Sequence, residues 1–190
     1  YVTTNALIFY AKAVALANLG RHEEAKAAMA SFTSAYAKVP ESRMLFNNKA
    51  RDVLAVAEEM MKGEIAFKAG RREEGLDHLR KAVDLDDNLE YEEPWSWPQP
   101  TRHALGALLL EAGEYEEAEA VYRADLGLDG KLPRPSQHPR NVWALHGLHE
   151  CLMRRGEDVE LPHIKLALDQ AVARADIPIR ASCLCRASAA

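Results

Sequence analysis

Imidazole and thiol groups are the side chains of this sequence with the clearest potential for chemistry. Histidine nitrogen and cysteine sulfur are ligands that zinc and copper prefer in proteins. Three histidines and a closely spaced cysteine pair offer such groups: His103, His146, His149, Cys183 and Cys185. Together they define a hypothetical zinc or copper site, either in a metal-binding module or in the C-terminal part of a metalloenzyme.

A simpler interpretation of these residues is preferred. His146 and His149 form a His-x-x-His pair that lacks the glutamate of the zinc-protease pattern His-Glu-x-x-His. An isolated Cys-x-Cys pair is more often a pair of free thiols than a pair of ligands. We therefore expect no cofactor, and zinc or copper is kept as the alternative.

Tryptophans near prolines suggest a second kind of site. Trp95 and Trp97 lie in the proline-rich segment 91–100, and Trp143 follows a second proline-rich segment. With Arg102 as a partner for a carboxylate, they could form an aromatic pocket for a peptide or small ligand. We prefer the alternative that the tryptophans hold their insertions onto the scaffold, because an insertion must bury apolar surface to stay ordered.

Catalytic motifs are not found in the sequence. It contains neither a glycine-rich phosphate loop nor a Gly-x-Ser-x-Gly nucleophile motif. Paired acids such as Glu23-Glu24 and Glu73-Glu74 are explained by helix starts and solvation. A binding function is therefore favoured over an enzymatic one.

The elements that position these side chains are marked by a recurring glycine followed by acidic residues. It occurs at Gly20, Gly70, Gly113 and, in a more degenerate form, Gly156. Glycine adopts the left-handed conformation that ends a helix, and glutamates suit the positive end of the next helix dipole. Each occurrence therefore predicts the turn of an αα-hairpin.

Segments with a helical spacing of apolar residues flank each turn. The predicted helices before the glycines are 5–19, 50–69, 102–112 and 142–155, and those after them are 22–37, 72–83, 115–126 and 158–175. The pattern predicts an all-α fold of about four antiparallel helical hairpins, at 4–38, 47–86, 100–127 and 141–175. We expect one helical domain over 1–175 and a C-terminal tail over 176–190.

Small residues around the turns resemble those of the tetratricopeptide repeat family, whose unit is about 34 residues long. The family's small residue, seven positions before the turn glycine, is matched by Ala13, Gly63 and Gly106. Its alanine after the turn is matched by Ala25 and Ala118, with Gly75 in the second copy, and its large residue by Met29, Leu79 and Tyr122. The resemblance implies an α-solenoid with this family's superhelix.

The sequence departs from the family pattern in two ways. The turn glycines are 50, 43 and 43 residues apart, so the hairpins are separated by insertions. In the fourth copy His149 and Leu161 replace the small residues. The two helices of that hairpin should therefore be spread or rotated.

The resemblance also implies a binding surface, because the first helices of this family line a concave groove. In the register of the turn glycines, Tyr10, Met60, His103 and His146 occupy equivalent groove positions, with Glu64, Trp143 and Glu150 on the same face. We expect a scaffold that binds a protein segment or small ligand there. His103 and His146 would also lie close enough to share a metal, since packed helices are about 8–10 Å apart.

Composition limits the remaining alternatives. The net charge of −5 and the scattered Lys and Arg argue against a nucleic-acid partner. No apolar run reaches the roughly 18–20 residues that a membrane span needs, and three cysteines cannot all pair within the chain. We expect a soluble, cytoplasmic protein with a protein or peptide partner. Homo-oligomers through an exposed terminal hairpin are an alternative, and so is a longer protein with sequence upstream of Tyr1.

Overall fold

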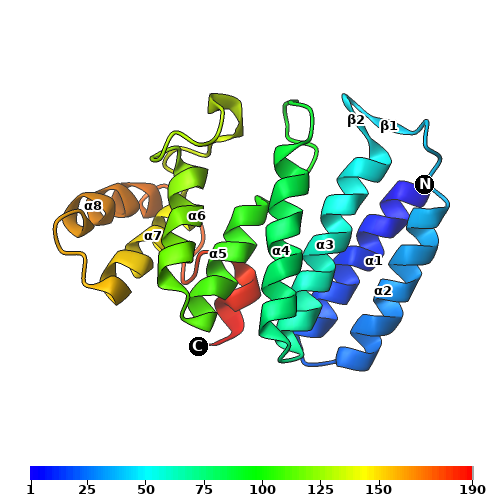
Figure 1. The fold of residues 1–190 in the computed structure, drawn as a ribbon, viewed down its shortest axis with the longest axis horizontal. Helices are drawn as coiled ribbons and strands as arrows, with labels where there is room; N and C mark the ends of the chain where they lie inside the picture. Colours follow the sequence, from blue (N-terminus) through cyan, green and yellow to red (C-terminus); the bar gives the residue numbers. More distant parts are fainter. Residues whose placement is uncertain (190) are drawn as a thin grey trace. The chain divides into compact units, whose positions relative to one another are not determined.

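The structure, a computed structural model, describes residues 1–189 and is built from helical hairpins (Figure 1). Within these residues the helices are α1 (Val2–Asn18), α2 (His22–Ala37), α3 (Ala50–Lys68), α4 (Arg72–Asp87), α5 (Thr101–Ala112), α6 (Tyr115–Leu126), α7 (Val142–Arg155) and α8 (Leu161–Val172). The short strands β1 (Met44–Leu45) and β2 (Asn48–Lys49) form an antiparallel pair. The predicted all-α, solenoid-type fold class is confirmed. None of the described helices is both long and apolar enough to span a membrane.

The predicted helix limits are close to the observed ones. α2, α6 and α7 begin and end where the sequence predicts, whereas α4 continues to Asp87 and α8 covers only Leu161–Val172. Pro162 stands in the first turn of α8, where a missing backbone N–H costs nothing. The residues before it form the turn of the hairpin, so α8 begins three residues later than predicted.

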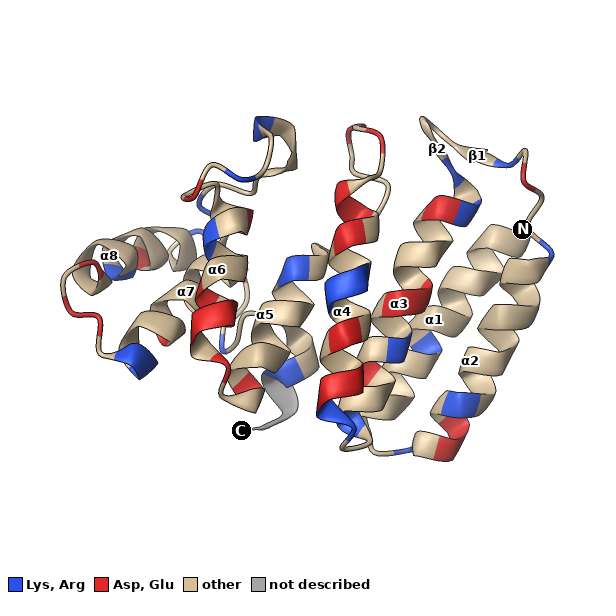
Figure 2. Cartoon of the chain, in the orientation of Figure 1, with Lys and Arg blue, Asp and Glu red and all other residues tan. Residues whose placement is uncertain are grey.

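The four turn glycines behave as predicted. Gly20, Gly70, Gly113 and Gly156 all have φ between 71° and 90°, the left-handed conformation. After Gly20, for example, the Arg21 N–H donates to the Leu16 carbonyl and closes the end of α1. Acidic residues open α2, α4 and α6, where Figure 2 shows red at the helix starts. Sequence and structure therefore agree on how each hairpin reverses.

Contacts between Cα atoms divide the chain into two compact units, residues 1–101 (unit 1) and 102–190 (unit 2). Each unit is described by itself below. The prediction of a single domain over 1–175 stays a prediction.

In unit 1 the two helices of the second hairpin contact each other at glycines, as the repeat register predicts. A Cβ on Gly75 would lie 2.8 Å from the Gly63 carbonyl oxygen and from Phe67 Cβ, and a Cβ on Gly63 would lie 2.7 Å from Leu79 Cγ. Leu79 is fully buried. Only glycine allows α3 and α4 to approach this closely at these two positions.

The insertion after α4 is fastened to the loop before α3 through Asn48. The Asn48 side chain donates to the Glu90 carbonyl at 2.8 Å and to Ser96 Oγ at 2.9 Å, and it accepts from the Glu90 N–H. The Glu92 carboxylate, 7% exposed, accepts from the Asn47 N–H at 2.9 Å. The proline-rich insertion is therefore an ordered part of unit 1.

In unit 2 Tyr122 of α6 occupies a slot between α5 and α7. A Cβ on Gly106 of α5 would lie 2.4 Å from Tyr122 Cζ, and a Cβ on Gly147 of α7 would lie 2.2 Å from the same atom. Tyr122 is fully buried. The tyrosine ring thus takes the space that the side chains of both glycines would fill.

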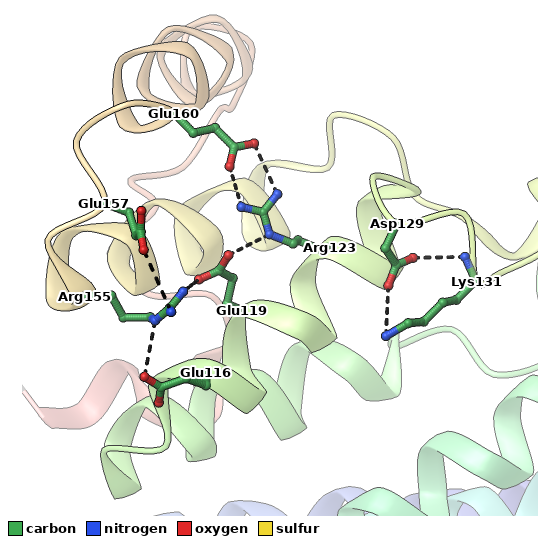
Figure 3. A network of polar contacts seen from close by, with 8 residues as sticks. All are labelled: Glu116, Glu119, Arg123, Asp129, Lys131, Arg155, Glu157 and Glu160. Carbon is green, nitrogen blue, oxygen red and sulfur yellow. Dashed lines mark hydrogen bonds and ion pairs between the residues drawn. The ribbon is translucent and has the colours of Figure 1, made fainter.

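Ion pairs bind α6 to α7 and α8 on another part of unit 2 (Figure 3). Arg123 of α6 donates to Glu119 at 2.7 Å and pairs with Glu160, which precedes α8. Arg155 at the end of α7 pairs with the same Glu119 and, at 3.3 Å, with Glu116. These charges join the fourth hairpin, which lacks the small residues of the family, to the third.

The C-terminal segment has buried residues and packs against the helices of unit 2. After α8 the chain runs without regular structure to a 3₁₀ turn, η2 (Leu184–Ala189), and Ala181, Ser182 and Cys183 are at most 6% exposed. Ser182 and Arg186 are bound within unit 2 by Tyr122 of α6 and Glu150 of α7. The division of the chain at residue 176 stays a prediction. Residue 190 lies outside the described residues.

Candidate functional site

Tyr10 and Trp97 bring α1 and the proline-rich insertion together in unit 1. Their ring centroids are 5.2 Å apart with an interplanar angle of 78°, an edge-to-face contact. The Tyr10 hydroxyl also donates to Gln99 Oε1 at 3.5 Å. Burial, together with the nearby charge of Glu64, raises the pKa of Tyr10, so this phenol stays protonated.

Glu64 of α3 is the buried carboxyl group of the same region. Its side chain is 1% exposed and accepts a hydrogen bond from Asn18 Nδ2 at 3.2 Å. Burial raises the pKa of Glu64 to about 7, although the bond from Asn18 and the charge of Lys68 oppose the change. A carboxyl group with this pKa exchanges its proton near neutral pH. We call Tyr10, Asn18, Glu64, Trp97 and Gln99 the unit 1 face.

Two predicted groove residues have other surroundings. Met60 is fully buried and belongs to the apolar core. Trp95 is 46% exposed, whereas Trp97 is 4% exposed. Within the insertion it is therefore Trp97 that fills space against the scaffold.

His103 and His138 share the carboxylate of Asp125 in unit 2. His103 Nε2 lies 3.0 Å from Asp125 Oδ2, and His138 Nδ1 lies 2.8 Å from Asp125 Oδ1. Burial alone would raise the pKa of Asp125, but the hydrogen bonds and charges of the two histidines outweigh burial and lower it. The arrangement links α5, α6 and the insertion 130–140, with His103 only 5% exposed. Arg102, the neighbour of His103, is half-buried in the first turn of α5.

His146 and Glu150 of α7 lie one helical turn apart beside the C-terminal segment. Arg186 donates to both Glu150 oxygens, at 2.7 and 2.9 Å. Burial lowers the pKa of His146, and the charges of Glu150 and Arg186 act on it in opposite directions. Trp143, one turn earlier in α7, is half-buried. We call the Tyr122 hydroxyl, Trp143, His146 and Glu150 the unit 2 face.

The candidate metal ligands do not form a set. Within residues 1–189 no group of three or more His, Cys, Asp or Glu side chains is placed to hold a metal ion. His103 is bonded to Asp125, and the sulfurs of Cys183 and Cys185 are joined to each other. Burial lowers the pKa of His149, which lies outside these contacts. The combined zinc or copper site of the sequence analysis has no geometric support.

Buried polar atoms without a hydrogen-bond partner concentrate on the two faces. In the part of the chain that the structure describes, four side-chain atoms are of this kind: Asn18 Oδ1, His22 Nδ1, Trp97 Nε1 and His146 Nδ1. Asn18 and Trp97 belong to the unit 1 face and His146 to the unit 2 face. An unsatisfied buried polar atom costs about 1–3 kcal/mol, so such atoms are rare unless a ligand or water satisfies them.

Hairpins closed by left-handed glycines, with alanine and glycine where the helices meet, define a helical-repeat protein. Comparison with family models matches the tetratricopeptide repeat at residues 6–38, which cover most of α1 and all of α2, and again at residues 99–124, which cover α5 and most of α6. The chain is therefore a tetratricopeptide repeat protein. Comparisons with curated proteins and with solved structures give no significant match.

Several residues that form the two faces or contact the candidate site residues were missed by the sequence analysis. Asn18 follows Tyr10 and Val14 on the same stripe of α1, so helical spacing was available to find it. Asp125 and Ser182 carry no sequence pattern that predicts their bonds to His103 and Tyr122. Their roles depend on how an insertion and a C-terminal segment fold back onto the helices.

Proposed function

We propose that this protein is an interaction scaffold that binds extended protein segments on the unit 1 face and the unit 2 face. Tetratricopeptide repeats generally mediate interactions between proteins, and the two repeat matches support this class of function. The observation that carries the proposal is the location of the unpartnered polar atoms. Three of the four such atoms in residues 1–189 belong to the two faces.

The chemistry of these atoms suits a polypeptide backbone. Trp97 Nε1 donates a hydrogen bond, Asn18 Oδ1 accepts one, and the neutral His146 ring does either through Nδ1. An extended segment presents alternating N–H and C=O groups, which satisfy a fixed donor and a fixed acceptor at the same time. Binding thereby removes the cost of leaving these atoms unsatisfied.

Among the groove residues expected from the sequence, the proposal assigns direct contacts to Tyr10, Trp97, Trp143, His146 and Glu150. Met60 and His103 support the faces from within, since Met60 belongs to the apolar core and the His103 ring is bonded to Asp125. Glu64 binds Asn18 and so fixes the orientation of its amide. Zinc and copper are not part of the proposal, because no observation on the described residues favours them.

The experiment is a selection of random 12-residue peptides on the full chain, followed by affinity measurements by fluorescence anisotropy. Asn18→Leu, Trp97→Phe and His146→Phe remove the unpartnered atoms while keeping similar shapes. We expect each selected peptide to lose about tenfold in affinity, or about 1.4 kcal/mol, for at least one of these variants. His22→Leu is the matched control, because it removes the fourth unpartnered atom, which lies at the start of α2 outside both faces.

Two results would count against the proposal. One is that no peptide is selected at all. The other is that the three face variants and His22→Leu change affinity equally. Homo-oligomerisation and a cytoplasmic location stay predictions, and sedimentation at several concentrations tests the first of them.

A further inference from the structure

The C-terminal segment lies on the unit 2 face in the manner of a bound peptide. The Tyr122 hydroxyl and Ser182 Oγ are 2.5 Å apart, and both groups are buried. Four residues later Arg186 reaches Glu150. Between them Cys183 and Cys185 are 6% exposed while Leu184, at 71%, points outward. Ala181 and Ser182 are buried as well, so residues 181–185 are covered by unit 2 except at Leu184.

The path of Tyr122 shows which side of unit 2 this segment covers. The tyrosine starts on α6 and fills the slot made by Gly106 of α5 and Gly147 of α7. A Cβ on Gly106 would lie 2.7 Å from the Tyr122 hydroxyl oxygen, so the hydroxyl lies beside α5, and there Ser182 meets it. The segment therefore contacts the far end of a side chain that starts on α6 and passes α5 and α7, which places it on the side of α5 and α7 opposite to α6. In a helical repeat this is the side formed by first helices.

Arg186 is the residue of the segment that this face recognises by charge. Its guanidinium makes two hydrogen bonds to the Glu150 carboxylate, with both side chains about one fifth exposed. Its bond to Glu150 and the charges of Glu150 and Glu111 raise the pKa of Arg186. A planar fork on a carboxylate selects arginine over lysine.

Two polar contacts hold the segment, which has no regular structure before η2. Residues 175–183 have no regular secondary structure, and Pro178 lies within them. Polar contacts to the helices include the hydroxyl pair and the arginine fork. His146 Nδ1 stays unpartnered beside them. The docked segment therefore leaves a polar group of the face unused.

We propose that residues 176–186 are an internal ligand of the unit 2 face, and that this face binds a partner protein segment with an arginine four residues after a serine or threonine. This inference rests on the proposed function, since it names the partner chemistry and the regulation of one of the two faces. The partner segment displaces the internal ligand. It gains the hydrogen bond to His146 that the internal ligand does not make.

Tethering makes the internal ligand a strong competitor. A segment joined to its site by a short flexible connection has an effective concentration of about 1 mM. A free segment with the same contacts therefore binds mainly when the internal one is weakened. The internal ligand therefore excludes weak partners from the unit 2 face, and partners that make additional contacts displace it.

The test uses the full chain and a fluorescein-labelled peptide with the sequence of residues 176–186, its two cysteines joined as in the chain. Arg186→Glu places a carboxylate against Glu150 and releases the internal segment. We expect the peptide to bind this variant at least about tenfold more tightly than the wild-type chain, because the tethered competitor is lost. A peptide carrying the same Arg186→Glu change should not bind it.

The charge-reversed pair supplies the control. In the variant with both Glu150→Arg and Arg186→Glu, the internal segment docks again with opposite charges, so the labelled peptide should bind no better than to wild type. Hydrogen exchange of residues 176–186 measures the same docking without a peptide: protection should fall in Arg186→Glu and return in the double variant. Unchanged circular dichroism in both variants shows that the helices remain folded.

Equal peptide affinities of wild type and Arg186→Glu would overturn the internal competition. Equal hydrogen exchange in the two chains would overturn the docking itself. These results are separate from those of the library selection, because Asn18→Leu and Trp97→Phe test the unit 1 face without touching this segment. If the library selection fails for the unit 1 face while the labelled peptide behaves as expected, the proposed function of the unit 1 face is refuted and this inference stands.

Discussion

Replacing Gly147 by alanine should force Tyr122 out of its slot between α5 and α7. A Cβ at this position would lie 2.2 Å from Tyr122 Cζ and 2.4 and 2.5 Å from the two Cε atoms, where ordinary contacts begin at 3.4 Å. Three atoms of a rigid ring would thus lie about 1 Å closer than an ordinary contact allows. The ring cannot withdraw toward α5, because Gly106 is packed against the same atoms.

The cost follows from two opposing effects. Overpacking of this size costs about 3 kcal/mol, at the upper end of the usual range. Alanine favours the helix over glycine by about 1 kcal/mol. We expect the free energy of unfolding to fall by about 2 kcal/mol and the melting temperature by roughly 4–8 °C. Urea denaturation followed by tryptophan fluorescence measures the first, with Trp143 in α7 as a local reporter.

The decisive comparison is the same substitution in a Tyr122→Leu background. Leucine lacks the distal ring atoms that meet Gly147, so the overlap disappears and only the helix preference of alanine remains. Gly147→Ala should then stabilise the protein by about 0.5–1 kcal/mol. If the substitution has the same sign in both backgrounds, the account of the slot is wrong.

Three further predictions concern other buried groups. The pKa of Glu64 is raised from 4.5 to about 7, so between these pH values the folded state holds a proton that the unfolded state releases. The contribution of this group to the free energy of unfolding is therefore full below pH 4.5 and falls as the pH rises to 7. The loss is about 3 kcal/mol, at 1.4 kcal/mol per pH unit. Glu64→Gln should remove this loss in urea titrations at pH 5 and pH 8, and an unchanged pH dependence contradicts it. Trp97→Ala should cost about 3 kcal/mol and Trp95→Ala under about 0.5 kcal/mol in the same assay, and equal costs would show that Trp97 does not hold the insertion. Asp125→Asn should destabilise unit 2 by about 2–4 kcal/mol, because it breaks a buried charge network, and should expose residues 130–140 to limited proteolysis; unchanged cleavage there would contradict the link through the two histidines.

The repeat architecture could be predicted from the sequence because each hairpin is determined by residues close to its own turn. Gly20 and Gly70 end their helices by backbone conformation, which depends on one residue and not on the rest of the fold. Gly63 and Gly75 were found in register because close helix contacts tolerate only the smallest residues. The limits of α8 were wrong by three residues at each end, since Pro162 favours a first helical turn that the apolar pattern does not mark.

The surroundings of the candidate residues could not be predicted in the same way. His103 was expected in the groove, but its ring is bonded to Asp125. That bond depends on where α6 ends and on how the insertion brings His138 to the same carboxylate. Long-range pairs between an insertion and a helix leave no periodic trace in a sequence. The docking of Ser182 on Tyr122, 60 residues earlier, is of the same kind.

The Tyr122 side chain passes between two glycines and so spans the helical layer formed by α5 and α7. One end of this side chain belongs to the outer helix α6, and its hydroxyl contacts the segment on the opposite side of the helical layer. Whatever replaces Ser182 there must accept the same tyrosine or push it back toward α6. The tyrosine ring is thereby the contact through which α6 meets whatever lies on the side of the C-terminal segment.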